Sequence, residues 1–341
     1  MLKSKVLETI TKYNLVESGD KIVLGVSGGP DSISMLDIFY KLKQENVLDI
    51  ELFVAHVNHG IRENAKLDEE YVKDYCLKRN IPFYVLNVNV VTLAEQAKRG
   101  VEETGRKVRY DFFDKVLKET SSNKIAIAHN RNDRVETIIM NALRGSGLAG
   151  LKGIEPKQNY YIRPLIECDR QEIEEYTDSE NLKPRIDESN FENDYTRNKI
   201  RNIVLPYVKE EFNPNIINTI LRLSDIVKED LSYINRQIEK EYLKIVEYED
   251  NLYKTDVYDE LKESTIILDL KKFLDLDMVI KKGIILYSIE KIFGNTKGIE
   301  KIHIEDIIKL CEKNIGNKFL TPNKKTKIVI KNKKIYIMSV K

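Results

Sequence analysis

The sequence lacks tryptophan and contains only three cysteines among its 341 residues. Cys76, Cys168 and Cys311 lie far apart and are odd in number, which excludes a disulfide framework, a Cys-x-x-Cys redox pair and a four-cysteine zinc site. Such sparse use of cysteine is typical of proteins from a reducing compartment. We therefore expect a cytoplasmic protein.

Long apolar runs are also lacking. No run approaches the roughly 20 apolar residues of a membrane span, and residues 1–14 carry charges among their apolar positions where a signal peptide has an apolar core. Glycine and proline number only 15 and 8, which excludes collagen-like and low-complexity chains. We expect an ordinary soluble protein with no membrane partner.

The net charge of +1 hides an asymmetry along the chain. Residues 301–341 hold 11 Lys or Arg against 3 acids, whereas residues 1–300 hold 45 against 52. A basic tail favours an anionic partner such as a nucleic acid. The alternative is a lysine-rich face that is simply solvated.

The length suggests two domains at about 150 residues each. Within the first two hundred residues, short apolar runs alternate with longer amphipathic stretches, a pattern typical of βαβ units. The predicted strands are residues 21–26, 50–57, 82–90 and 124–128, and the predicted helices are residues 33–44, 66–79, 102–119 and 133–143. We predict an α/β fold with a doubly wound, mostly parallel, Rossmann-like sheet. Its ligands should bind beyond the carboxyl ends of the strands.

The pattern changes near Asn213-Pro-Asn215, which interrupts the helices. A long amphipathic helix over residues 215–246 follows, then a strand at 265–270, and helices near 280–293 and 303–313. Alternating residues at 325–330 and 334–338, with Asn332 between them, predict a lysine-rich hairpin. We place a catalytic domain at 1–214 and a smaller, mainly helical domain at 215–341, ending in this basic β-hairpin.

The clearest local feature is a glycine-rich loop directly after the first predicted strand. It consists of Ser27, Gly28, Gly29, Pro30, Asp31 and Ser32. The glycines let backbone amides approach a phosphate closely, while the serines and the following helix N-terminus add donors. No lysine reaches the terminal phosphates as in GxxxxGK[ST], and Asp31 offers a carboxylate for Mg²⁺. The alternative is a glycine turn in which Ser32 or Asp31 caps the helix.

Two further segments follow predicted strands or open helices. His56-Val-Asn-His-Gly-Ile-Arg62 ends the second strand, where it predicts a nucleotide-edge or structural role, because two histidines alone make a poor metal site. An exposed polar loop is the alternative. In residues 100–110, Arg106 and Arg109 share a helix face and suit phosphate recognition. An ion pair from Glu102 to Arg106 on a surface helix is the alternative there.

The last two segments carry paired charges at helical spacing. Asp133 and Glu136 share a helix face after the fourth strand, and they could hold Mg²⁺ or the ammonium of an amine substrate. Solvated acids that favour the helix dipole are the alternative. Arg197 and Arg201, one turn apart in residues 195–201, could project together toward phosphate. A capped helix with charged flanks is the alternative for that segment.

In this order the five segments resemble the motifs of the tRNA(Ile)-lysidine synthetases, members of the N-type ATP pyrophosphatase, or PP-loop, superfamily. The fifth motif of that family matches Asp187-Glu-Ser-Asn190 followed by Tyr195-Thr-Arg-Asn-Lys-Ile-Arg201. The fourth departs from the family pattern at Asn130, Asn132 and Arg134. The resemblance covers residues 21–207.

This resemblance implies an enzyme that uses ATP to adenylylate the wobble cytidine of a CAU-anticodon tRNA(Ile), after which free L-lysine displaces AMP to form lysidine. It implies ATP and Mg²⁺ as cofactors, with Asp31 as the magnesium ligand. The implied catalytic residues are Asp31, Arg109, His129, Asp133, Glu136 and Arg201. The implied nucleotide-binding residues are Ser27, Gly28, Gly29, Pro30, Asp31, Ser32, Ala55, His56 and Arg106.

Two other functions stay open at this stage. A tRNA thiolase also activates a base carbonyl through AMP, but such enzymes generally need cysteine pairs, which this sequence lacks. A non-catalytic ATP-binding module would need the loop but neither the Asp133/Glu136 pair nor the Arg197/Arg201 segment. A homodimer stays open as the assembly.

Overall fold

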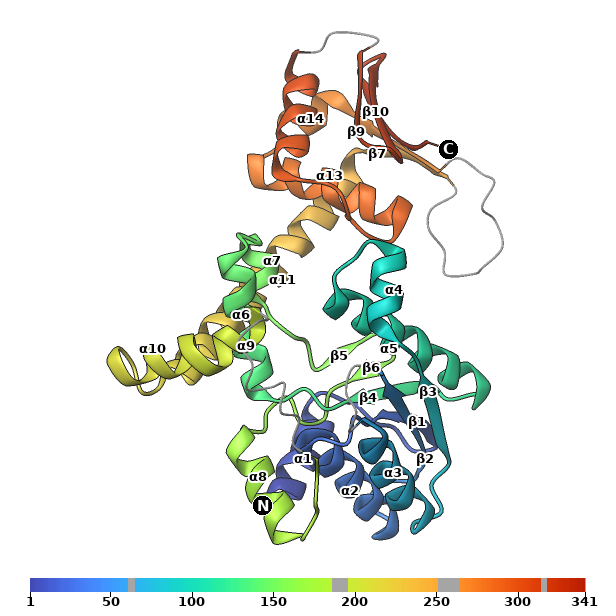
Figure 1. Ribbon diagram of the computed structural model, residues 1–341. Coiled ribbons are helices and arrows are strands. Elements are labelled where there is room, and N and C mark those ends of the chain that lie inside the picture. Colours follow the sequence, from blue (N-terminus) through green and yellow to red (C-terminus); the bar gives the residue numbers. More distant parts are fainter. Residues whose placement is uncertain (61–64, 186–195, 251–263, 314–317, 341) are drawn as a thin grey trace. The chain divides into compact units, whose positions relative to one another are not determined.

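The computed structural model describes residues 1–60, 65–185, 196–250, 264–313 and 318–340. The chain forms two compact units, residues 1–227 and residues 228–341, whose elements are labelled in Figure 1. No helix in the described ranges combines the length and the apolar character needed to cross a membrane.

The first unit is built on a six-stranded sheet in the order β3-β2-β1-β4-β6-β5. Its strands are β1 (Asp20–Gly25), β2 (Ile50–Asn58), β3 (Phe83–Asn87), β4 (Lys124–Ile127), β5 (Lys157–Gln158) and β6 (Tyr161–Ile162). All neighbours pair in parallel except β5 with β6. The predicted mostly parallel sheet is confirmed, and its central strand β1 leads directly into the glycine-rich loop.

Helices cover both faces of this sheet (Figure 1). The helices that begin in this unit are α1 (Leu2–Lys12), α2 (Pro30–Gln44), α3 (Ala65–Leu77), α4 (Val90–Ala97), α5 (Val101–Glu119), α6 (Arg131–Leu143), α7 (Gly147–Leu151), α8 (Arg170–Ser179), α9 (Thr196–Lys199), α10 (Leu205–Glu211) and α11 (Ile216–Ile245). Successive side chains of β1 point to opposite faces. Ile22 and Leu24 therefore enter the core shared with α1, α2, α3 and α8, whereas Val23 packs with Phe113 of α5 on the other face.

Strand β3 (Phe83–Asn87) is shorter than the strand predicted from the apolar run at residues 82–90. Asn89 accepts a hydrogen bond from the amide of Thr92 at 3.1 Å, and it thereby caps helix α4. Asn is a favoured helix cap because its side-chain oxygen satisfies an amide that has no partner within the helix. The capped helix takes over Val90, the last residue of the predicted strand.

The unit boundary differs from the one predicted at residues 214/215. Helix α11 does begin close to that point, but its first turns pack through Ile216, Ile217 and Leu221 against Val135 and Ile138 of α6. These contacts bury the start of α11 in the first unit. The division therefore falls inside the helix, between Val227 and Lys228.

The second unit contains a five-stranded antiparallel sheet in the order β7-β8-β11-β10-β9. Its elements are β7 (Val246–Asp250), β8 (Thr265–Asp269), α12 (Leu270–Leu274), α13 (Met278–Phe293), α14 (Lys301–Lys313), β9 (Lys318–Asn323), β10 (Thr326–Lys331) and β11 (Lys334–Ser339). Strands β7 and β9 come in addition to those predicted. Apolar side chains from the strands and from α13 and α14 share one core.

The predicted basic hairpin is confirmed as β10 and β11, which pair with Lys331 opposite Lys334. Asn332 and Lys333 form its two-residue turn with φ values of 52° and 59°. Positive φ at both central residues is the geometry whose twist matches that of the flanking strands.

Candidate active site

The glycine-rich loop is held in shape by one of its own side chains. Oγ of Ser32 accepts hydrogen bonds from the amides of Ser27 at 3.1 Å and Gly28 at 3.2 Å, and donates to the carbonyl of Gly29 at 3.0 Å. Gly28 has a φ of +94°, a left-handed conformation that side chains rarely adopt. Pro30 starts α2 at a position where no amide is needed. The loop is therefore compact and leads straight into a helix N-terminus, the arrangement that binds anions.

The end of β2 is fastened to this loop. The carbonyl of Ala55 accepts from the amide of Val26 at 3.0 Å, and Nδ1 of the buried His56 lies 2.8 Å from the carbonyl oxygen of Val26. Burial lowers the pKa of His56, which keeps it neutral at physiological pH. A carbonyl can only accept, so Nδ1 carries the proton. Arg62, which closes this motif, lies outside the described residues.

Helix α5 brings the third motif beside the segment that follows β2. Nη2 of Arg109 lies 3.4 Å from Nε2 of His59, while Arg106 donates to the hydroxyl of Tyr110 at 3.2 Å. The helix runs without a break through Gly105. A Cβ atom at this position would lie 3.5 Å from Cγ1 of Val90, which is ordinary van der Waals contact. Arg106 and Arg109 thus lie on α5 as predicted.

The fourth motif opens helix α6 with a reciprocal cap. The side chain of Asn130 accepts from the amide of Asp133 at 3.0 Å, and the carboxylate of Asp133 accepts from the amide of Asn130 at 2.9 Å. Asn130 also donates to Oδ1 of Asp31 at 2.8 Å. Burial, together with the negative charge of Asp133, raises the pKa of Asp31 to about 6. The loop carboxylate and the α6 carboxylates therefore belong to one site.

Asp133 and Glu136 are joined to the two arginines of the fifth motif. Arg197 donates from Nε to Oε2 of Glu136 and from Nη2 to Oδ1 of Asp133, both at 2.8 Å. Arg201 donates from Nε to Oε1 of Glu136 at 2.6 Å, and its Nη2 lies 2.8 Å from Oε2 of Glu136 and 3.1 Å from Oδ1 of Asp133. Burial alone would lower the pKa of both guanidinium groups, but the two carboxylates raise it. We call these four residues the charge quartet.

The local backbone presents both arginines to α6. Helix α9 continues through a π-helical turn at Ile200–Val204 into α10. Pro206, two residues into α10, has no amide hydrogen to complete the usual ladder, which favours a wider turn before it. Arg197 and Arg201 are four residues apart and face the same side, as their spacing predicted. Asp187–Asn190 and Tyr195 of this motif lie outside the described residues.

His129 is neutral and is held by a residue that lies outside the five sequence motifs. Nε of Arg163, a buried residue just after β6, donates to Nδ1 of His129 at 3.2 Å. Burial and the Arg163 charge hold the pKa of His129 well below its ordinary value. Because Nδ1 accepts this hydrogen bond, the ring proton is on Nε2. Arg163 stands alone in its segment, so no local spacing pattern identifies it.

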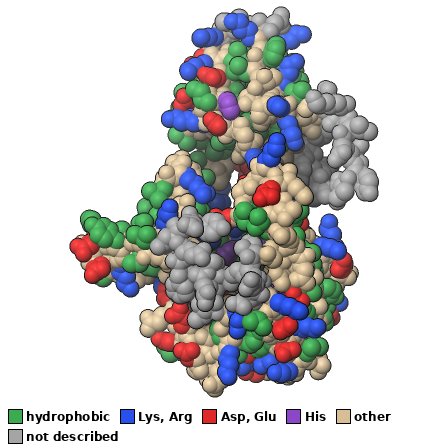
Figure 2. Space-filling model, viewed as in Figure 1, with side chains coloured by type: hydrophobic (Ala, Val, Ile, Leu, Met, Phe, Trp, Pro, Cys, Tyr) green, Lys and Arg blue, Asp and Glu red, His purple; other side chains and the backbone are tan. Residues whose placement is uncertain are grey.

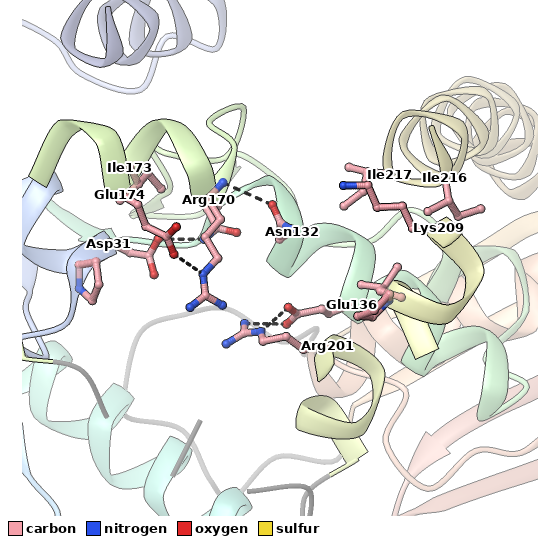
Figure 3. A pocket seen from close by; sticks show the side chains of 14 residues that line it. Asp31, Asn132, Glu136, Arg170, Ile173, Glu174, Arg201, Lys209, Ile216 and Ile217 are labelled. Atoms are coloured by element: carbon pink, nitrogen blue, oxygen red, sulfur yellow. Dashed lines mark hydrogen bonds and ion pairs between the residues drawn. The ribbon is translucent and has the colours of Figure 1, made fainter. Parts of the chain in front are cut away.

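A cavity of about 350 Å³ adjoins Asp31, Glu136 and Arg201 (Figure 3). It is lined by Pro30, Asp31, Asn130, Asn132, Glu136, Arg170, Ile173, Glu174, Arg201, Leu205, Pro206, Lys209, Ile216 and Ile217. Isoleucines of α8 and α11 give it an apolar wall, and Arg170 pairs with Glu174 at 2.9 Å on its polar side. These residues of α8, α10 and α11 belong to none of the five sequence motifs.

The carboxylate of Asp31 fits a magnesium site that would be shared with phosphate. Within the described ranges, no three His, Cys, Asp or Glu side chains cluster as a ready-made metal site. Magnesium in nucleotide sites takes one or two carboxylates and completes its shell with phosphate oxygens and water. Asp31, at the start of α2 in the glycine-rich loop, is such a carboxylate.

Comparison with known proteins agrees with this geometry. Residues 2–208 match the PP-loop domain family. The chain is 41% identical to the tRNA(Ile)-lysidine synthase of Clostridioides difficile, over 98% of this chain and 71% of that protein. It is 42% identical to the enzyme of the same name from Caldanaerobacter subterraneus, over 93% of this chain and 65% of that protein. The chain belongs to the tRNA(Ile)-lysidine synthase family. The resemblance predicted from the motifs is thereby confirmed.

A solved structure agrees with the PP-loop fold of this lysidine synthase family member. The U34-tRNA thiolase NcsA from Methanococcus maripaludis, solved with its [4Fe-4S] cluster, superposes with a TM-score of 0.55 at 21% identity. The match covers 67% of this chain and 78% of the thiolase. The predicted doubly wound fold is confirmed. The chain spans 65–71% of the length of the two lysidine synthases named above.

Proposed function

We propose that this chain ligates L-lysine to C2 of the wobble cytidine in tRNA(Ile) with a CAU anticodon, using ATP and releasing AMP and pyrophosphate. The observation that carries the proposal is the joining of three groups at one edge of the sheet. One network of hydrogen bonds and ion pairs joins Asp31 of the glycine-rich loop, Asp133 of α6 and Arg201. Asn130 bonds both aspartates, and Arg201 pairs with Asp133 in the charge quartet. A phosphate site therefore adjoins a carboxylate pair suited to an amine.

The chemistry needs both halves of this site. A cytidine carbonyl has no leaving group, and transfer of AMP to its oxygen supplies one. Loop amides and the N-terminus of α2 stabilise the negative charge that develops on departing pyrophosphate. Asp31 would hold Mg²⁺ beside the phosphates, where the ion would supply further neutralisation of this charge. The amine of lysine then attacks the activated carbon.

Asp133 and Glu136 provide the anionic surface for that amine. Free lysine has a pKa near 10.4, so its nucleophilic nitrogen must lose a proton before attack. His129 is a poor acceptor, because its pKa is depressed and its Nδ1 is engaged by Arg163. We therefore propose that a carboxylate takes the proton and that His129 positions the substrate through its Nε2 hydrogen.

Thiolation is the nearest alternative chemistry on this fold, and the positions of the three cysteines disfavour it. Cys76, Cys168 and Cys311 are all buried free thiols, and none lines the cavity. Burial raises the pKa of each to about 12, so no thiolate is ready to carry sulfur. Ligation of an amine needs no sulfur carrier.

We further propose that the second unit contacts tRNA through its basic surface. Figure 2 shows several Lys and Arg side chains on the visible face of this unit, with fewer acids among them. Lys331 and Lys333 of the hairpin are exposed, as are Lys324 and Lys325 in the turn that leads from β9 into β10. Lysines of this kind bind the phosphate backbone without reading its sequence.

The test is transfer of labelled lysine to a tRNA(Ile) transcript with a CAU anticodon, with and without ATP. The CAU-bearing methionine tRNA is the substrate control. We expect ATP-dependent label on the isoleucine tRNA alone, and loss of that label in Glu136→Gln. Glu119→Gln, an exposed change at the end of α5, is the matched control. Release of pyrophosphate without transfer of label would retain adenylylation and reject lysine as the nucleophile. Absence of both pyrophosphate release and label would reject the proposal as a whole.

A further inference from the structure

The carboxylates proposed to receive lysine already hold two cations. Five contacts of 2.6–3.1 Å join Asp133 and Glu136 to Arg197 and Arg201. Two negative and two positive charges leave the charge quartet neutral. Only 1% of the Glu136 surface is exposed. A lysine ammonium added to this arrangement would bring an uncompensated positive charge into a poorly solvated place, which is unfavourable.

The carboxylates are the fixed members of the quartet. Asp133 is tied into the cap of α6, where its other oxygen accepts from the amide of Asn130. Its side chain is 12% exposed, whereas those of Arg197 and Arg201 are 25% and 24% exposed. The arginines reach the carboxylates from the solvent side on long side chains. Exchange of partners within the quartet would therefore move the guanidinium groups.

Arg201 lies close to a second possible partner, and Arg197 is one helical turn away on the same face. Arg201 lines the same cavity as Pro30 and Asp31, the first residues of α2 in the glycine-rich loop (Figure 3). A guanidinium fork matches a phosphate as well as it matches a carboxylate. A nucleotide triphosphate at that loop would compete with Asp133 and Glu136 for the two arginines.

We propose that Arg197 and Arg201 make lysine binding conditional on ATP. Building on the proposed function, the arginines act as exchangeable counter-ions. Nucleotide phosphates draw them away from Asp133 and Glu136, and the exposed carboxylate pair then attracts the lysine ammonium. ATP and lysine thus bind with positive coupling, and the coupling is reciprocal by thermodynamic linkage. Lysine therefore binds after ATP, the molecule that activates the cytidine.

The experiment is equilibrium dialysis of labelled lysine against the full chain, first with Mg²⁺ alone and then with Mg²⁺ and saturating α,β-methylene-ATP. We expect the analogue to strengthen lysine binding at least tenfold. Saturating lysine should strengthen analogue binding by the same factor. Lysine affinity that is equal in both arms would overturn the coupling and leave the proposed ligation intact. Absence of lysine transfer in the labelling assay would instead remove the proposed function.

Substitution separates the arginines from other cations nearby. In Arg197→Gln/Arg201→Gln, the carboxylates have no counter-ion, so lysine should bind more tightly without nucleotide and the analogue effect should fall below twofold. Arg131→Gln is the matched control, because Arg131 lies on α6 but pairs with Asp169 at 3.0 Å. Tenfold coupling that persists in the double variant would overturn the proposal. Where the double variant does not fold, the two dialysis arms on the unaltered chain still test the proposal, because equal lysine affinity in both would overturn it.

Discussion

The side-chain amide of Asn130 donates to Oδ1 of Asp31 at 2.8 Å, across 99 residues of sequence. The same side chain caps α6 by accepting from the amide of Asp133. One residue therefore joins the glycine-rich loop after β1 to the carboxylate helix after β4. Asn130 is one of the three positions at which the fourth motif departs from the family pattern, so in this chain a side-chain amide makes the connection.

The first prediction concerns this amide. Asn130→Ala removes a helix cap, which costs about 1 kcal/mol of folding free energy, and it frees Asp31 from its neutral donor. We expect a lower free energy of unfolding in urea and several-fold weaker binding of an ATP analogue with Mg²⁺. Asn89→Ala is the control, because Asn89 caps α4 through the amide of Thr92 in the same way but does not line the cavity. Equal effects of the two substitutions on analogue binding would contradict this role of Asn130.

The second prediction uses the buried carboxylate of Asp37. It accepts from the hydroxyls of Tyr75 and Tyr176, both at 2.6 Å, and pairs with Lys41 at 3.0 Å. Burial alone would raise the pKa of Asp37, but these partners lower it overall. A depressed carboxyl pKa stabilises the fold fully above the unfolded value of 3.8, and the benefit is lost as pH falls through the folded value.

Asp37→Asn should therefore cost about 2 kcal/mol of unfolding free energy at pH 6, because charged hydrogen bonds are lost. The difference from the unaltered chain should be constant from neutral pH to about pH 5 and should shrink below about pH 4. Urea unfolding across this range measures it. Asp111→Asn, an exposed residue paired with Lys107 on α5, should show little change at any pH. A difference that grows on acidification would refute the assignment.

The third prediction is that all three thiols are inert in the native chain. Burial raises the pKa of Cys76, Cys168 and Cys311 to about 12 each. Thiol–disulfide exchange needs an accessible thiolate. Dithiobis(nitrobenzoate) at pH 8 should therefore release no rapid colour from the folded protein and the equivalent of three thiols in denaturant. A rapid native phase would show an accessible cysteine.

Much of the first unit was predictable, because its elements are set by short-range patterns. Ile22, Val23 and Leu24 are all fully buried, and a strand covered on both faces appears in sequence as a continuous apolar run. The loop motif then follows from the order strand, glycines, helix. The helical spacing of Arg197 and Arg201 likewise predicted that they share a face.

The partners of those arginines were not predictable in the same way. Arg197 meets Glu136 across 61 residues, a contact that depends on how α9 packs on α6. Arg163 reaches His129 across 34 residues from a segment with no spacing pattern. In the second unit, β9 (Lys318–Asn323) is largely exposed on its side chains, so it lacks the apolar alternation that identifies a strand. These partners and this strand depend on packing between segments far apart in the sequence, which local sequence patterns do not reveal.

The fourth prediction concerns the basic hairpin and tRNA. Deleting residues 318–341 would be a poor test, because Ile328, Ile330, Ile335 and Ile337 of β10 and β11 are buried in the core of the second unit. The exposed lysines offer a cleaner change. Lys324, Lys325, Lys331 and Lys333 can all be replaced by Gln without touching that core.

This fourfold variant should bind tRNA more weakly, and the plot of log affinity against log salt should be flatter, by up to about 0.9 in slope for each lysine that contacts a phosphate. ATP-analogue binding and the unfolding temperature should be unchanged. Replacement of four exposed lysines of the first unit, Lys73, Lys78, Lys115 and Lys118, makes the same change in net charge. Long-range attraction depends on net charge, whereas contact with phosphates depends on the position of each lysine. The slope of log affinity against log salt should therefore become flatter only in the hairpin variant. Equal flattening in both variants would show that the hairpin lysines are a solvated basic surface without tRNA contacts.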